Sequence, residues 1–357
     1  MTPDRENSSV APFHVCEYAD TAAVDFLTQD WPRLFERDAS ATVYQDPYWL
    51  LAWARQLPAS CEPLIVAVCG PAGPVSALAL VREACRGGGT RIFPLSWPAS
   101  EQVLPLGATQ QTADLLVTKA SELAASGCQV TIADLPSDSA FGRQAELQWG
   151  RPGVESLYAT VPLPLDIAAL SRSTRRDHQR RRRIVQELGG RVGYVRTRTT
   201  GELLQAYRTL EDLHALRNRD RPAAALASDL SLPWPQVLRQ CASLAFVATL
   251  TVDGEAVAAQ LCLQWNGRAH SVVTAMDPAH HQLSPGHLLL ELLCDDLARE
   301  GYVALELGRT VSDSGQRAYK SSYGAVWTLT RTYSVHSNMS DCTEDFSSAG
   351  KISVTAA

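Results

Sequence analysis

The residues best suited to chemistry lie in one stretch, His280 to Gly324, where a Ser284-Pro285-Gly286 turn precedes the apolar segment LLLELL. This pattern predicts a helix that begins near Gly286. The first N–H groups of a helix have no partners within it, and together with the helix dipole they attract anions. We therefore expect a phosphate-bearing cofactor to bind at five consecutive residues, Ser284, Pro285, Gly286, His287 and Leu288. A helix start that Ser284 and Pro285 stabilise, with no ligand, is the competing interpretation.

A strand, VALELG, is predicted after this helix, and it carries a carboxylate at Glu306. Ala304 and Gly308 share its face, because side chains alternate along a strand. A carboxylate in a mostly apolar sheet has either a partner or a raised pKa, and both suit a base that accepts a proton from an amine. A structural ion pair with an arginine explains Glu306 equally well.

A basic segment, RSTRRDHQRRRR, places seven arginines between Arg172 and Arg183 on a predicted helix. Asp177 is the only nearby acid before Glu187, so these arginines cannot all form ion pairs within the helix. A solvated connecting helix is one interpretation, and a clamp for the phosphates of coenzyme A, a nucleotide-linked acceptor or tRNA is the other. The chain as a whole has a net charge of -6, so this local concentration favours phosphate binding. Arg217, after a later helix, is expected to extend the same surface and contact substrate.

Neither a metal site nor a nucleophilic triad is predicted. The nine cysteines are scattered without a C-x-x-C pair and mostly lie in apolar contexts, which indicates buried thiols and neither disulfides nor a zinc site. His280, His281 and His287 have no acidic or cysteine partner at ligand spacing. The G-x-S-x-G nucleophile motif is absent.

The composition is that of a soluble globular protein, with 357 residues, 45% of them hydrophobic and 20% charged. This length suffices for two domains of ordinary size. No segment approaches the roughly 20 consecutive apolar residues that span a bilayer, and the N-terminus MTPDRENSSVAP lacks the apolar core of a signal peptide. We therefore expect a cytoplasmic protein, while the oligomeric state stays open.

The pattern of predicted elements divides the chain near Pro162 into an N-terminal domain at 13–160 and a C-terminal domain at 161–337. Flexible polar tails are expected at 1–12 and 338–357. Each half contains helical segments, two strands joined by a turn, a further strand, a helix and another strand. The strands AHSVVTAM and VALELG, joined by a helix, should be parallel. The sequence thus predicts an α/β chain of tandem domains, each a mixed, mainly antiparallel sheet flanked by helices.

The same order of elements resembles a known family. A hairpin, a strand ending M-D-P, an SPG turn, a helix, a strand ELG and then YK followed by YG are similar to the CelD-like acetyltransferases of the GNAT superfamily. The pattern also resembles the FemABX-type aminoacyltransferases, which share that fold in two tandem copies. The similarity is best over 160–335, and in the first half it rests on element order and the segment YQDPYWLLAW. At the usual R/Q-x-x-G-x-G/A pyrophosphate turn this chain has His281, Ser284 and Gly286, of which only Gly286 agrees.

The resemblance implies tandem GNAT-like domains that transfer an acyl group, with acetyl-CoA as the first expectation, to a small-molecule amine. Direct attack needs no covalent enzyme intermediate, and the donor would lie in a gap between AHSVVTAM and VALELG. By resemblance, Lys320 would stabilise negative charge on the donor or on the tetrahedral intermediate. Tyr319 or Tyr323 would protonate the leaving group. Arg309 and His270 would contact substrate.

Two alternatives stay open at this point. Aminoacyl transfer from charged tRNA, bound through Arg172–Arg183, uses the same fold with a different donor. A non-catalytic binding module on a degenerate fold would explain why the pyrophosphate motif is incomplete.

Overall fold

The computed structural model describes four stretches of the chain: residues 13–85, 88–217, 232–310 and 314–336. The tails predicted at 1–12 and 338–357 lie outside them. The strands of the first half are β1 (His14–Ala19), β2 (Cys61–Gly70), β3 (Gly73–Ala84), β4 (Thr90–Pro94), β5 (Cys128–Pro136) and β6 (Val154–Pro162). Its helices are α1 (Asp20–Gln29), α2 (Trp31–Arg37), η1 (Val43–Gln45), α3 (Pro47–Ala54), α4 (Gln110–Ala125) and α5 (Ala140–Trp149).

The second half repeats this order after the short η2 (Ile167–Ala169) and the long helix α6 (Arg172–Leu188). Its strands are β7 (Val192–Arg196), β8 (Ala245–Val252), β9 (Glu255–Trp265), β10 (Arg268–Met276), β11 (Ala304–Thr310) and β12 (Val326–Val335). Its other helices are η3 (Gly189–Arg191), α7 (Thr200–Arg217), α9 (Trp234–Gln240), η4 (Ala242–Leu244), η5 (Pro278–Leu283), α10 (Pro285–Arg299) and α11 (Ser314–Ser321).

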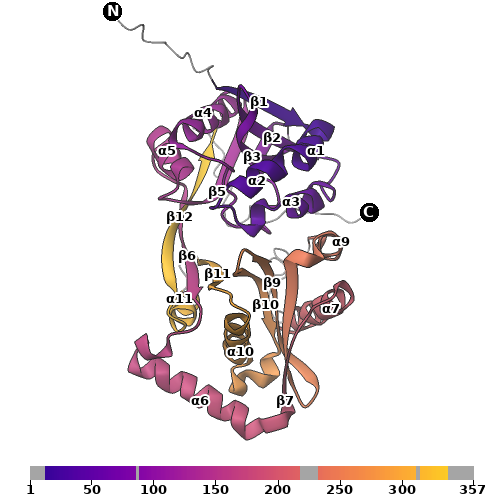
Figure 1. Ribbon diagram of the computed structural model, residues 1–357, viewed down its shortest axis with the longest axis vertical. Helices are drawn as coiled ribbons and strands as arrows, with labels where there is room; N and C mark the ends of the chain where they lie inside the picture. Colours follow the sequence, from indigo (N-terminus) through magenta and orange to yellow (C-terminus); the bar gives the residue numbers. More distant parts are fainter. Residues whose placement is uncertain (1–12, 86–87, 218–231, 311–313, 337–357) are drawn as a thin grey trace, which may run out of the picture.

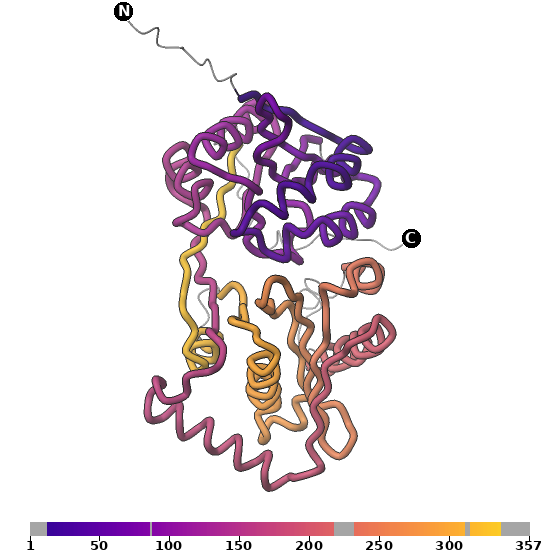
Figure 2. Tube along the Cα trace, viewed as in Figure 1, coloured from indigo at the N-terminus to yellow at the C-terminus, as the bar shows by residue number. Residues whose placement is uncertain are grey.

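The twelve strands of the described residues form one sheet, in the order β1-β2-β3-β4-β5-β12-β6-β11-β10-β9-β8-β7. The order is symmetric about the central β12–β6 pair, because each half gives its last strand to the other half. β6 pairs with β11, and β12 pairs with β5. In Figure 2 the last strand of the chain, drawn in yellow, therefore runs up among the first-half elements. This exchange ties the two halves together by backbone hydrogen bonds.

Two strand pairs are parallel, β4 with β5 and β10 with β11, and each pair is joined by a helix, α4 or α10. The parallel pairing predicted for AHSVVTAM and VALELG is thus confirmed. The sequence did not predict β1, α5 or β6, and it predicted a polar loop where α11 begins. Among the residues that the structure describes, no helix combines the length and apolarity needed to cross a bilayer.

The largest hydrophobic core lies where helices of both halves meet, α1–α3 from the first and α7 and α9 from the second (Figure 1). Trp49, Trp53 and Trp234 form its centre, with ring centroids 5.5 to 5.9 Å apart. Aromatic pairs at this spacing each contribute about 0.5–1.5 kcal/mol beyond the area that they bury. The first half is therefore packed against the second and not merely linked to it.

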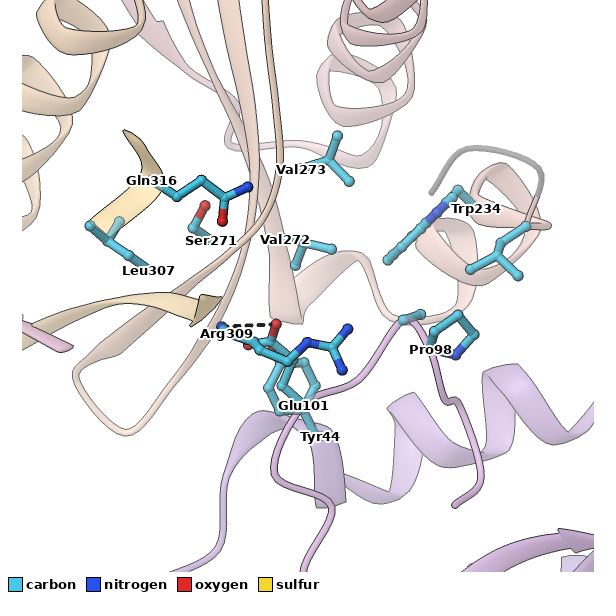
Figure 3. Close-up of a pocket in the computed structure, with 12 residues that line it drawn as sticks. Tyr44, Pro98, Glu101, Trp234, Ser271, Val272, Val273, Leu307, Arg309 and Gln316 are labelled. Carbon is cyan, nitrogen blue, oxygen red and sulfur yellow. Dashed lines mark hydrogen bonds between the residues drawn. The ribbon is translucent and has the colours of Figure 1, made fainter. Parts of the chain in front are cut away.

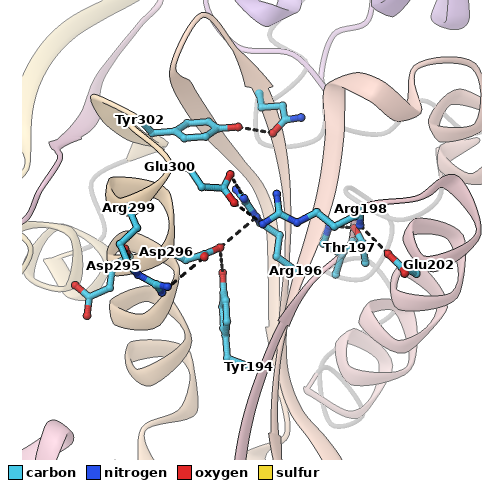
Figure 4. Close-up of polar contacts among 12 residues, drawn as sticks. Tyr194, Arg196, Thr197, Arg198, Glu202, Asp295, Asp296, Arg299, Glu300 and Tyr302 are labelled. Carbon is cyan, nitrogen blue, oxygen red and sulfur yellow. Dashed lines mark hydrogen bonds and ion pairs between the residues drawn. The ribbon is translucent and has the colours of Figure 1, made fainter.

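A buried arginine joins β7 to the last turns of α10 (Figure 4). Arg196 forms ion pairs with Asp296, at 3.2 Å, and with Glu300, and its guanidinium lies 5.0 Å from the Phe246 ring centre. Hydrogen bonds from Arg198 and Arg196 lower the pKa of Glu300 to about 2. This network fixes the position of α10 against the sheet.

Candidate active site

The sheet opens between β10 and β11. These parallel strands pair only where Arg268–His270 face Ala304–Glu306, although each strand continues for several residues. Bulges follow on both sides, at Ser271/Val273 in β10 and at Glu306/Gly308 in β11. Bulges redirect strands and end pairing. The predicted gap between the two strands is therefore present.

A cavity of about 350 Å³ occupies this opening (Figure 3). Both halves of the chain line it, through Tyr44, Pro98, Ala99, Glu101, Leu232, Trp234, Ser271, Val272, Val273, Leu307, Arg309 and Gln316. Figure 3 shows Glu101, Arg309 and Tyr44 together on one side, with Trp234 on another. The cavity combines charged and polar side chains with apolar ones, and a concave site with convergent polar groups is suited to small-molecule binding.

Glu101 reaches this cavity from the first half, on the segment between β4 and α4. That segment is held in place by two side-chain hydrogen bonds: the Trp49 indole N–H donates to Ser100 Oγ at 2.8 Å, and Gln45 Nε2 donates to the Leu104 carbonyl at 2.7 Å. Glu101 is a site residue that the sequence did not reveal.

The Glu101 carboxylate lies against the backbone of β11. It accepts a hydrogen bond from the Arg309 backbone N–H, with both oxygens 3.1 Å from the nitrogen. Gly308 has φ +70°, and a Cβ there would lie 2.5 Å from Glu101 Oε2. Only glycine permits both this backbone angle and this close approach.

Asp134, Arg309 and Lys320 contribute to the electrostatics around Glu101. Burial, with the added charge of Asp134, raises the pKa of Glu101 to about 7. Burial also raises the pKa of Asp134, while the Arg309 guanidinium, 3.2 Å from its carboxylate, lowers it. A carboxyl group that titrates near neutrality in a cavity is suited to accept a proton during catalysis.

Lys320 lies behind the end of β11. Its ammonium group donates hydrogen bonds to the carbonyls of Gly308, at 2.8 Å, and Arg309, at 2.9 Å. Burial lowers its pKa to about 8. Lys320 thus holds the strand end that carries Arg309, and it is not among the residues lining the cavity.

Glu306 and His270 face a second cavity, of about 330 Å³, that also contacts the first half. The Glu306 carboxylate accepts hydrogen bonds from Thr160 Oγ1, at 2.5 Å, and Arg268 Nε, at 2.9 Å. The ion-pair interpretation of Glu306 therefore describes its contacts, with Arg268 as the partner. Burial lowers the pKa of His270 to about 3, so its ring is neutral at physiological pH.

The two tyrosines lie elsewhere than predicted. Tyr323 bonds through its hydroxyl to His287 Nδ1 at 2.8 Å, and the Tyr319 hydroxyl donates to the Gly286 carbonyl at 3.4 Å. Burial raises the pKa of both phenols. Helix α11 thus directs Tyr319 towards α10, and neither tyrosine lines the cavity beside Glu101.

The expectation of bare N–H groups at the start of α10 is wrong at four of the five positions. The Ser284 N–H donates to the His281 carbonyl, and those of His287 and Leu288 donate to the Ser284 carbonyl, at 2.9 to 3.1 Å. Pro285 has no N–H. Gly286 alone keeps its N–H for another partner, and a Cβ at this glycine would lie 2.6 Å from the Met276 methyl carbon. Gly286 therefore packs closely against the end of the Met276 side chain.

The seven arginines of α6 differ in their surroundings. Arg181 is buried and pairs with Glu291 on α10. Four others follow the exposed face of the helix at spacings of three or four residues, and within the described stretches none forms an ion pair: Arg172, Arg176, Arg180 and Arg183. Arg217 lies on α7 and donates to the Thr274 carbonyl at 3.1 Å. Figure 1 shows α6 along the end of the molecule farthest from the first half.

Comparison with known proteins agrees with this architecture. A family described as an acetyltransferase (GNAT) domain matches residues 172–321. No curated protein matches the chain in sequence. Residues 172–321 thus match an acetyltransferase (GNAT) domain, and the resemblance expected from the sequence is confirmed.

Solved structures extend the likeness to both halves. The crystal structure of FemX is 12% identical, with a TM-score of 0.60 over 87% of this chain and 96% of that one. L-PGS from Bacillus licheniformis is 15% identical, with a TM-score of 0.56 over 87% and 92%. A tandem GNAT protein from the clavulanic acid biosynthesis pathway is 14% identical, with a TM-score of 0.50 over 91% and 100%. The chain thus shares its fold with these three structures, among them a tandem GNAT protein.

Proposed function

We propose that this chain transfers an acyl group from acyl-CoA, with acetyl-CoA as the first choice, to a small-molecule amine in the cavity between β10 and β11. The observation that supports it most is the position of Glu101. A carboxyl group whose pKa is raised to about 7 lies where the sheet opens, beside Arg309. The cavity is thus lined both by strands of the segment that matches the GNAT domain and by a carboxyl group that can accept a proton near neutral pH.

The reaction follows from these groups. The neutral amine nitrogen attacks the thioester carbonyl, the C–N bond forms, and the C–S bond breaks as coenzyme A leaves as a thiolate. Glu101 accepts the proton that the attacking nitrogen loses. Beyond His270 the edge of β10 is no longer paired with β11, so its backbone groups are available to the reacting carbonyl. Lys320 holds the end of β11 and adds positive charge near Glu101.

The donor's phosphates need positive groups, and the start of α10 supplies only the Gly286 N–H. We therefore assign a larger share of phosphate binding to side chains than the sequence suggested. Aminoacyl transfer from charged tRNA is the second candidate, and the row of four unpaired arginines on α6 favours it. An extended row of exposed cations suits a polyanion better than it suits a single diphosphate.

Filling the cavity tests the proposal. Ser271→Phe is expected to reduce acyl transfer from acetyl-CoA to an amine at least about 100-fold, because a displaced reacting group loses that much rate. Ser126→Phe, at the exposed end of α4, is the matched control and should retain the wild-type rate. Equal rates for both variants, at equal melting temperatures, would refute the proposed site.

The same proteins distinguish the donors by melting temperature. A ligand that binds only the native state raises it. Acetyl-CoA is expected to raise the melting temperature of the wild type and of Ser126→Phe, and aminoacyl-tRNA is not. The reverse result would favour the second candidate.

A further inference from the structure

Three side chains that can bind a metal ion, one imidazole and two thiols, meet on one face of the sheet edge formed by β1 and β2. His14 and Cys16 are two residues apart on β1, so their side chains share a face. Cys69 on β2 lies directly opposite His14 in the strand register. One ligand atom from each of the three residues lies within 4.8 Å of the others. The sequence does not reveal this group, because the pairing of β1 with β2 brings the third ligand from a distant part of the chain.

The surroundings of the three residues suit a cation. Cys69 is buried, Cys16 is half-buried and His14 is exposed, so the group is closed on the protein side and open to solvent. Tyr18 is next on the same face of β1, and burial, together with the nearby Cys69 and Cys16, raises the pKa of its phenol. The Asp30 carboxylate adds negative charge near Cys69. All the cysteines of the described residues are free, so both sulfurs are available.

We propose that His14, Cys16 and Cys69 bind one Zn²⁺ ion, with a fourth position open to water or to an external ligand. Zinc binds thiolate sulfur at about 2.3 Å and imidazole nitrogen at about 2.0–2.1 Å, usually in tetrahedral geometry. Ligand atoms of such a site are about 3–4 Å apart, so small side-chain rotations close the observed group. Binding releases the two thiol protons and leaves a neutral site, since two thiolates balance the charge of Zn²⁺.

The site is separate from the cavity where acyl transfer is proposed. β1 is an edge strand of the sheet, and six strands lie between it and β11 in the strand order. A metal here would pin the edge strand to β2. Its role does not depend on the proposed function.

Cobalt substitution tests the site in the full chain. Reduced protein, stripped with a chelator, is expected to bind one Co²⁺ with the charge-transfer absorption of thiolate ligands, and one equivalent of Zn²⁺ should abolish that absorption. Cys69→Ala and Cys16→Ala should lose it. Cys61→Ala, at the other end of β2, is the matched control and should keep it.

His14→Ala guards against variants that fail to fold, because this side chain is exposed and contributes little to the core. Zn²⁺ should raise the melting temperature of the wild type and of Cys61→Ala but not of His14→Ala. Absence of thiolate absorption in the wild type, or the same absorption in Cys69→Ala, would overturn the proposal. A Cys16–Cys69 disulfide that forms in preference to metal binding under mild oxidation, with no Co²⁺ bound by the reduced chain, would overturn it as well.

Discussion

Replacing Glu101 with glutamine is expected to lower kcat/KM for acyl transfer about 100- to 1000-fold, the usual contribution of a general base. Glutamine keeps an oxygen that can accept the Arg309 N–H, so the backbone contact at 3.1 Å persists. It cannot accept the proton of the attacking amine. The measurement is a steady-state rate with acetyl-CoA and a responsive amine.

The pH dependence sharpens this test. Because burial and Asp134 raise the pKa of Glu101 to about 7, the wild-type rate should rise with pH up to about 7 and then level off as the carboxylate form is reached. The rise should disappear in Glu101→Gln. Glu155→Gln, at an exposed glutamate, is the control and should keep both the rate and the profile. A wild-type profile that survives in Glu101→Gln would assign the base elsewhere, with Glu306 the next residue to test.

Replacing Arg181 with leucine is expected to destabilise the chain by about 3 kcal/mol or more. Breaking a buried ion pair costs about 3–5 kcal/mol because it leaves the other charge without compensation. Arg181 and Glu291 have only 4% and 10% of their side-chain surface exposed, and His178 Nδ1 lies 2.9 Å from the same carboxylate. Denaturant unfolding measures the effect.

The neighbouring residue provides the control. Arg182 is exposed, so Arg182→Leu should change the free energy of unfolding by less than about 0.5 kcal/mol. Burial alone would raise the pKa of Glu291, but hydrogen bonds from His178 and Arg181 lower it below the ordinary value of 4.5. The stabilisation by the charged form of Glu291 is present above a pH of 4.5 and is lost as the pH falls through the lowered pKa. The free energies of unfolding of Arg181→Leu and Arg182→Leu should therefore become similar in acid. If both variants lost the same free energy of unfolding at neutral pH, the ion pair of Arg181 with Glu291 would not be what holds α6 on α10.

The order of elements was predictable because hydrophobic period and turn residues are local signals. The Asp253-Gly254 turn, the helix after Ser284 and the strand around Glu306 all follow from them. The exchange of β6 and β12 was not predictable, because strand order depends on contacts between segments far apart in the chain. The residues of a single strand do not indicate which other strand it pairs with.

The candidate site also depends on contacts between distant segments, which the sequence does not predict. Glu101 lies in a loop with no motif, and only its contact with the Arg309 backbone and the glycine at 308 gives it a role. Conversely, the turn at Ser284 carried a plausible motif, but the 3₁₀ segment before it and the first turn of α10 already use most of its N–H groups. Tyr319 was grouped with Lys320 by sequence, but consecutive residues of a helix point about 100° apart. Within α11, Tyr319 therefore contacts α10 and Lys320 contacts β11.

Photolabelling tests the central claim most directly, namely that acyl transfer takes place where β10 and β11 separate. An acyl-CoA that carries a photoreactive group on its acyl chain should label residues within 271–273 or 307–309 on irradiation, and excess acetyl-CoA should prevent the labelling. Protected labelling confined to other parts of the chain, such as the parallel pair β4 and β5, would contradict the account.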